Sequence, residues 1–200
     1  MKRVHLASLL TAGFMAVAAA PAAAGPTAPL AATGCAAPTL APALFAFGDA
    51  RSYFTAPGGD FESDAHGWNL TGGAMPSAGS GPLRSGVAAR SLRLPAGATA
   101  TSPVFCVDLH YPTFRFFAAK GRSELSVDVI YPALGTKQPK AVTVKGGSTR
   151  WTLTKDVSLR PDAVTKTAGW RYVQLRFAAD SRAKGAWLVD DVLIDPRMRG

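Results

Sequence analysis

Short runs in which apolar and polar residues alternate recur along most of the chain. In 124–131, Leu125, Val127 and Val129 alternate with polar residues, and 171–179 repeats the pattern. A period of two is typical of a β-strand with one buried face. No segment keeps a helical period. The pattern predicts about ten strands, at 44–47, 67–71, 91–94, 103–107, 113–119, 124–131, 140–145, 150–154, 171–179 and 186–194.

Glycine, proline, aspartate and serine separate the predicted strands, as in the loop 72–82 and the turn 135–139. Many short strands joined by such turns indicate a β-sandwich. We therefore predict an all-β fold with a single sandwich domain over residues 44–197.

The first 24 residues have the features of a secretory signal peptide. Two basic residues precede an apolar run over 6–20, which is short for a membrane span, and three alanines precede Gly25. We expect residues 1–24 to be removed, and the Ala- and Pro-rich residues 25–43 to form a flexible leader. No later apolar run is long enough for a membrane helix. The sequence therefore predicts a secreted protein, extracellular or associated with the cell envelope, without a membrane span.

The chain has two cysteines, Cys35 and Cys106. An even number of cysteines in a secreted chain favours a disulfide, and two cysteines alone are too few for a zinc site. We therefore predict a Cys35–Cys106 disulfide that fastens the leader to a strand. Lipidation of Cys35 is an alternative, but the leucine that a lipobox needs three positions earlier is absent.

The chain is basic, with 22 lysines and arginines against 13 acidic residues and a net charge of +9. Such a charge is compatible with polyanions as partners. The basic residues are scattered, however, and no basic run or nucleic-acid motif is present. We expect a basic surface and no specific binding of nucleic acid.

Three stretches carry a resemblance to a known family: 60-DFESDAHGW-68, 91-SLRLPAGATATSP-103 and 187-WLVDDVLID-195. They resemble the first and last strands, and a middle segment, of galactose-binding-like jelly rolls, a group that includes many carbohydrate-binding modules. The resemblance covers roughly residues 45–196. It implies a sandwich of jelly-roll type whose first and last strands lie side by side. The composition also resembles that of secreted actinobacterial proteins.

The resemblance further implies a structural calcium ion between those two strands. Asp60 and Glu62 from the opening, with Asp190 or Asp191 from the end, would supply carboxylate oxygens, which calcium prefers. Strand alternation lets only one of the last two point inward, and the resemblance favours Asp190. In the alternative, Glu62 pairs with an arginine, and Asp190 and Asp191 form a bulge in solvent.

Sugar binding needs flat aromatic surfaces together with planar polar groups. The positions opposite the core on the central strands offer such groups: Arg115, Phe117, Asp128, Tyr172, Gln174 and Arg176. We expect these side chains to share one sheet face and to bind the ligand. The alternative is a solvated face whose charges pair across strands.

The sequence contains no nucleophile elbow, zinc-binding HExxH helix or phosphate-binding loop. The adjacent Asp190 and Asp191 alternate across a strand, which disfavours a paired-carboxylate hydrolase. We therefore expect an exported, non-enzymatic module that binds a carbohydrate or a cell-envelope glycan. The alternative is a structural or protein-interaction domain of the envelope without a small ligand.

Overall fold

The computed structural model describes residues 34–84, 89–108, 110–146, 148–159 and 169–195. The predicted signal peptide, the start of the predicted leader (25–33) and the end of the predicted domain (196–197) lie outside these ranges.

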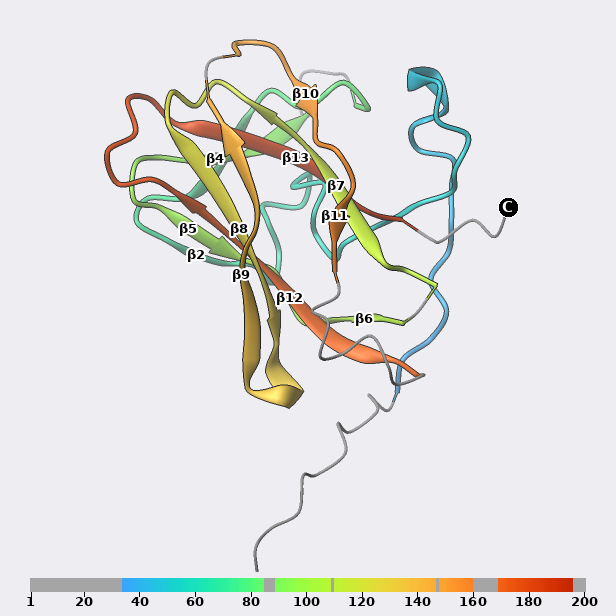
Figure 1. Cartoon of the computed structure of the whole chain (residues 1–200). Coiled ribbons are helices and arrows are strands. Elements are labelled where there is room, and N and C mark those ends of the chain that lie inside the picture. Colours follow the sequence, from blue (N-terminus) through green and yellow to red (C-terminus); the bar gives the residue numbers. More distant parts are fainter. Residues whose placement is uncertain (1–33, 85–88, 109, 147, 160–168, 196–200) are drawn as a thin grey trace, which may run out of the picture.

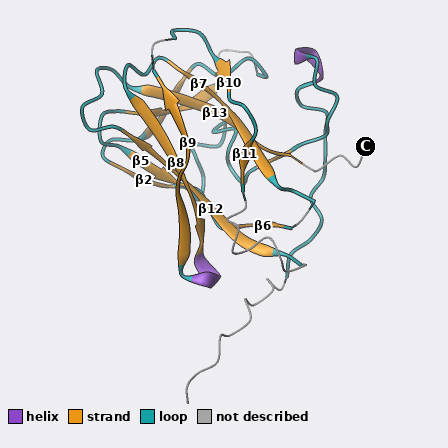
Figure 2. Cartoon of the chain, in the orientation of Figure 1, coloured by secondary structure: helices purple, strands orange, loops and turns teal. Residues whose placement is uncertain are grey.

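Two antiparallel sheets pack face to face (Figures 1 and 2). One contains β1 (Phe54–Thr55), β3 (Met75–Ala78), β4 (Arg90–Leu94), β7 (Thr113–Ala119), β10 (Thr152–Leu153), β11 (Val157–Ser158) and β13 (Trp187–Asp195). Its order is β10-β7-β13-β4-β3, with β1 beside β13 and β11 beside β7.

The other contains β2 (Asn69–Thr71), β5 (Thr99–Thr101), β6 (Phe105–Val107), β8 (Glu124–Tyr131), β9 (Thr136–Lys145) and β12 (Arg171–Ala179). Its order is β2-β5-β12-β8-β9, with β6 beside β12. Two short 3-10 helices, η1 (Phe45–Phe47) and η2 (Pro132–Leu134), complete the described elements. The chain is thus an all-β sandwich of jelly-roll type, as the sequence predicted.

The alternating strands bury one face, as their period requires. In β12, Val173, Leu175 and Phe177 are fully buried, while the residues between them are partly exposed. Aromatic rings from both sheets meet in this core, with the ring centroids of Phe116 and Phe177 5.1 Å apart. Burial of such apolar area is the main force that holds the two layers together.

The strand predicted at 44–47 is wrong. Phe45–Phe47 form η1, a single 3-10 turn that ends at Gly48 in a left-handed conformation with φ 78°. Leu44 is fully buried, whereas Phe45 is 71% exposed. One anchoring side chain therefore fixes the turn, and the apolar run does not pair with a sheet.

The opening and closing segments of the domain lie side by side, as the resemblance implied. β1 pairs antiparallel with β13, and Phe54 lies opposite Ile194. Beyond β1, the Ala56 N–H donates to the Val192 carbonyl at 2.8 Å, and the Val192 N–H donates to the Gly59 carbonyl at 2.9 Å.

An N-terminal strap, residues 35–53, runs along the outside of the sandwich beside the seven-stranded sheet (Figure 1). The predicted Cys35–Cys106 disulfide is present and fastens its start to β6. Further on, Leu44 and Tyr53 pack with Phe117 of β7 in a small second core. The last part of the predicted leader therefore lies against the sandwich.

Ion pairs hold the end of the strap. The Arg51 guanidinium contacts the carboxylates of Asp49, Asp156 and Asp195.

Within the described residues, no helix combines the length and the apolar character that crossing a membrane requires.

Candidate functional site

The six residues predicted to bind a ligand do not share one face, so that part of the prediction is wrong. Arg115 and Phe117 lie on β7 of the seven-stranded sheet, whereas Asp128, Tyr172, Gln174 and Arg176 lie on β8 and β12 of the six-stranded sheet. Consecutive strands β7 and β8 belong to different layers. The local pattern fixes which residues alternate, but it does not fix the layer.

The strap covers the two residues on β7. Phe117 is buried, and its ring lies 5.5 Å from that of Phe47. The Arg115 guanidinium lies 2.9 Å from an Asp49 carboxylate oxygen and 3.3 Å from one of Asp156. Both side chains therefore serve to attach the strap.

The other four residues belong to a polar outer face of the six-stranded sheet. Across the strands, Arg176 lies opposite Thr101 on one side and Asp128 on the other. The Gln174 amide already donates to the Ser102 carbonyl at 2.9 Å. Arg176 is more available to a ligand than Gln174, because its side chain is 40% exposed. Its ion pair with the Asp128 carboxylate is long, at 3.7 Å.

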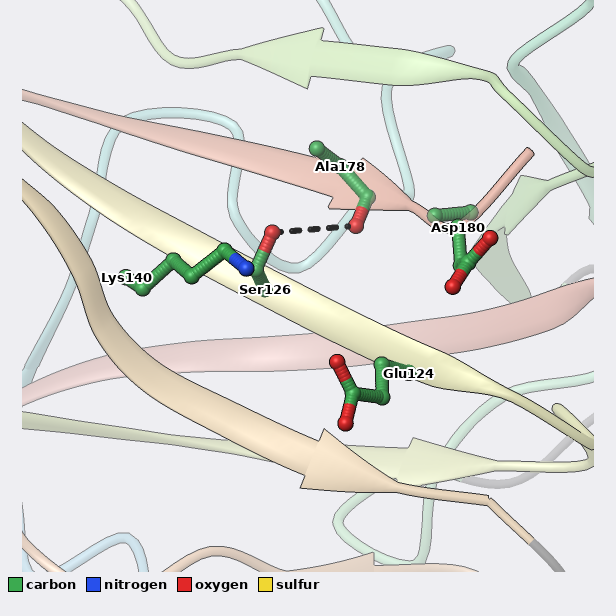
Figure 3. Close-up of a pocket in the computed structure, with 6 residues that line it drawn as sticks. Glu124, Ser126, Lys140, Ala178 and Asp180 are labelled. Carbon is green, nitrogen blue, oxygen red and sulfur yellow. Dashed lines mark hydrogen bonds between the residues drawn. The ribbon is translucent and has the colours of Figure 1, made fainter. Parts of the chain in front are cut away.

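This face contains a pocket of about 210 Å³ (Figure 3). Its lining comes from β8, β9, β12 and the turn after β12, and consists of Glu124, Ser126, Lys140, Ala178, Ala179 and Asp180. Ala178 lies opposite Thr99 on one neighbouring strand and Ser126 on the other. The small side chain of Ala178 leaves room for the pocket between these neighbours.

A bulge in the edge strand β9 places Lys140 at the pocket. The pairing of β8 with β9 shifts between Val127 and Val129, and Lys140 has φ 48°. Pro139 has no N–H for the ladder, which favours a bulge on an edge strand. The Asp128 carboxylate accepts the Lys140 N–H at 2.8 Å and so stabilises the irregular backbone.

The pocket mixes hydrogen-bond donors with acceptors. The Arg182 N–H donates to the Asp180 carboxylate at 2.7 Å and lowers the pKa of that carboxyl below its usual value. The Ser126 hydroxyl donates only weakly to the Ala178 carbonyl, at 3.4 Å (Figure 3). Carboxylates, an ammonium group and a hydroxyl together suit a small polyhydroxylated ligand. Tyr172 lies six residues along β12, roughly 20 Å away, so it does not line this pocket.

The residues predicted to bind calcium lie together at the junction of the opening segment with β13. A β-bulge in β13 follows Asp190, and Asp191 adopts φ 46°. An added Cβ on Gly81 would lie 3.2 Å from Asp190 Oδ2 and 3.3 Å from Asp191 Oδ2. The expectation that only one of the two aspartates points inward is therefore wrong, because the bulge turns both toward Gly81.

Both aspartates are buried, which also excludes a bulge with its carboxylates in solvent. Burial, and after it the charge of the adjacent Asp191, raise the pKa of Asp190 to about 8, against the lowering effect of the backbone hydrogen bonds from Gly81 and Asp191. Burial is likewise the main reason that the pKa of Asp191 is raised to about 6. The guanidinium of Arg84 opposes this rise, whereas the carboxylates of Asp60 and Glu62 add to it. The fold therefore destabilises the ionised forms of these two side chains.

The residues present have the chemistry of a cation site. Among the described residues, Oδ2 of Asp191 is solvent-excluded and has no hydrogen-bond partner. Glu62 accepts the Arg90 backbone N–H at 3.2 Å and forms no ion pair with an arginine in the described structure. Across the described ranges, no three His, Cys, Asp or Glu side chains are arranged to hold a metal ion as they stand. Calcium binding by Asp60, Glu62 and Asp190 stays a prediction.

Comparisons with known proteins give structural likeness only. No family model and no curated protein matches the chain. The solved structures similar to it include the carbohydrate-binding module TmCBM61 in complex with beta-1,4-galactotriose, at 13% identity and TM-score 0.43, covering 72% of this chain and 99% of that one. A family 22 carbohydrate-binding module of Clostridium thermocellum is 16% identical with TM-score 0.42, covering 74% and 96%. The Stig cyclase Fisc from Fischerella sp. TAU is 11% identical with TM-score 0.48, covering 72% and 97%. Identities and TM-scores this low carry no functional argument, so the function of the chain has to be inferred from its own geometry.

Proposed function

We propose that the protein is an exported, non-enzymatic module that binds a glycan through the outer face of the six-stranded sheet. The observation that carries the proposal is the pocket above Ala178, lined by carboxylate, hydroxyl and ammonium groups. Its volume is below that of pockets for drug-sized ligands, which suits a single sugar unit of a chain. Arg176 and Asp128 continue the polar surface beyond the pocket.

The electrostatics of Asp180 disfavour this side chain as the proton donor of a hydrolase. A glycoside hydrolase needs one carboxylic acid whose pKa is raised, so that it can protonate the leaving group. Glu124 and Asp180 both line the pocket, but Arg182 keeps the pKa of Asp180 low and its carboxylate ionised. The ionised Asp180 carboxylate can instead accept hydrogen bonds from sugar hydroxyls without any reaction.

Export is supported by the disulfide as well as by the predicted signal peptide. The Cys35–Cys106 bond is consistent with an extracellular protein, because reducing compartments disfavour such bonds. We expect the protein to act outside the cell or in the cell envelope.

Filling the pocket tests the proposal. The full protein is applied to a glycan array, and Kd is measured for each glycan that binds. We expect Ala178→Leu to weaken binding at least about tenfold, because the added side chain occupies the space of the ligand. Ala78→Leu is the matched control, since it adds the same atoms to an exposed position on β3 of the other sheet. Lys140→Ala removes one lining group without filling the pocket, and it should also weaken binding.

Equal affinity for the wild type and Ala178→Leu would refute the site, and release of reducing sugar from a bound glycan would refute the non-enzymatic role. Binding to no glycan would favour the alternative, a protein-interaction domain. One observation supports that alternative: Phe45 and Phe47 are 71% and 48% exposed on the same short turn of the strap.

A further inference from the structure

The junction between the opening segment and β13 has more negative than positive charge. The carboxylate of Glu62 raises the pKa of both buried aspartates, Asp190 and Asp191, and that of Asp60 raises the pKa of Asp191. The cation in the cluster is Arg84, whose guanidinium lies 3.0 Å from Asp60 Oδ2 and 3.7 Å from Asp191 Oδ1. Among the described residues, the four carboxylates, when ionised, therefore outnumber the one guanidinium that forms ion pairs with the cluster.

Arg84 satisfies this cluster incompletely. Among the described residues, Asp191 Oδ2 has no partner although it is excluded from water, which is unfavourable above all when the carboxylate is ionised. Asp190 accepts two backbone N–H groups, from Gly81 and from Asp191, but no side-chain cation contacts it in an ion pair within the described residues. A small divalent cation would match these oxygens better than one guanidinium at the edge of the cluster.

The position of Arg84 allows it to leave. Its side chain is 44% exposed, so it can turn into solvent at little energetic cost. The same position keeps Asp60 and Asp191 turned toward a guanidinium instead of a common ion. This explains why the described carboxylates converge without the arrangement of a metal site.

We propose that Arg84 is an exchangeable internal counter-ion of the Asp60–Glu62–Asp190–Asp191 cluster. Its guanidinium neutralises part of the cluster when no divalent cation is bound, and calcium displaces it from Asp60 and Asp191. The two cations exclude each other because they use the same carboxylate oxygens and repel each other at close range. Gly81 leaves the necessary space, since any Cβ there would contact both aspartate Oδ2 atoms.

Calcium titration of the EDTA-treated protein by isothermal calorimetry tests the exchange. We expect Arg84→Gln to bind calcium about tenfold more tightly than the wild type, because the competing charge is gone. Arg90→Gln is the matched control: Arg90 is also 44% exposed and pairs with a single carboxylate, that of Asp64. It should bind calcium as the wild type does. Equal or weaker binding by Arg84→Gln, or no binding by either protein, would overturn the proposal.

Thermal unfolding separates an exchangeable counter-ion from a fixed ion pair. In EDTA, Arg84→Gln should melt below the wild type, because its cluster has lost its only neighbouring guanidinium among the described ion pairs. In excess calcium the difference should vanish or reverse. A deficit of equal size in both conditions would show that Arg84 is fixed in place, contrary to the proposal. Asp191→Asn should abolish the response to calcium in both measurements, and an unchanged response would count against the cluster as the site.

Discussion

Removal of the Cys35–Cys106 disulfide should destabilise the protein while leaving its native structure unchanged. The bond joins residues separated by 71 positions. In the chain-entropy model, a crosslink over such a loop lowers the entropy of the unfolded chain by roughly 15 cal/mol/K, or about 4 kcal/mol at 25 °C. Both cysteines are half-buried, so alanine in their place removes little packing. We expect Cys35→Ala/Cys106→Ala to lower the free energy of unfolding by about 4 kcal/mol.

The native strap should stay in place without the bond. Leu44 and Tyr53 remain buried against Phe117, and Arg51 keeps its three carboxylate partners. The effect therefore arises in the unfolded chain, which gains conformations that the crosslink had removed. The pocket above Ala178 lies on the other sheet, so glycan binding should be retained.

Urea denaturation followed by circular dichroism measures the loss, and the melting temperature should fall by roughly 8–16 °C. Reduction of the wild type should reproduce the effect, and reductant should leave the double variant unchanged. A loss below about 1 kcal/mol would refute the entropic reasoning. Proteolysis of the strap in the folded variant would also refute it, since the bond would then hold the strap itself.

Two further predictions concern the strap and the core. Arg51 and then Tyr53 donate hydrogen bonds that hold the pKa of Asp49 well below its usual 3.8, against the opposing effect of burial. This stabilisation is present above pH 3.8 and is lost as the pH falls through the lower pKa of the native state, so Asp49→Asn should lower the free energy of unfolding by about 2 kcal/mol at pH 7. Urea denaturation at pH 7 and pH 2 should show that the difference between variant and wild type shrinks in acid. A constant difference would contradict the assignment. Gly121→Ala would place a Cβ 2.0 Å from the buried Trp187 ring, so a loss of about 3 kcal/mol is expected by the same assay. Gly185→Ala should cost only about 1 kcal/mol, because no atom of the described residues lies within 4 Å of an added Cβ there, although φ is 90°; equal losses would show that backbone strain is decisive.

The strands with one open face could be predicted from the sequence. In β8 and β12 the apolar positions are buried and those between them are exposed to some degree, so a period of two is visible without tertiary information. That the opening and closing segments of the domain meet was predicted from the resemblance, although β1 was not among the predicted strands, and the disulfide was predicted from the number of cysteines.

The strap could not be predicted from local pattern, because its contacts join residues far apart in the chain. A signal was nevertheless present in β7, where Phe117 alternates with Phe116 and makes both faces apolar. A strand with two apolar faces is covered on both sides. All nine residues of β13 are buried, so this strand is likewise covered on both faces.

The bulged strands β9 and β13 account for most of the features of the pocket and of the carboxylate cluster that the sequence failed to predict. The sequence placed Pro139 in the turn 135–139, whereas the structure places it within the edge strand β9. A proline there favours a bulge, and that bulge brings Lys140 to the pocket. Asp191 belongs to a residue type that tolerates positive φ, and its bulge turns two successive carboxylates the same way. Strict alternation fails wherever a bulge adds a residue to one strand.

The unequal chemistry of the two outer faces decides where a ligand can bind. On the seven-stranded sheet, Phe117 and Leu193 are apolar on the outer side, and exposure of these side chains to water would be unfavourable. The strap provides that cover with Leu44 and Tyr53. On the six-stranded sheet, the outward positions of β12 are polar or small and need no cover. The strap therefore covers the outer face of the seven-stranded sheet, whose side chains are apolar. It leaves the outer face of the six-stranded sheet, with its pocket, open to a polar ligand.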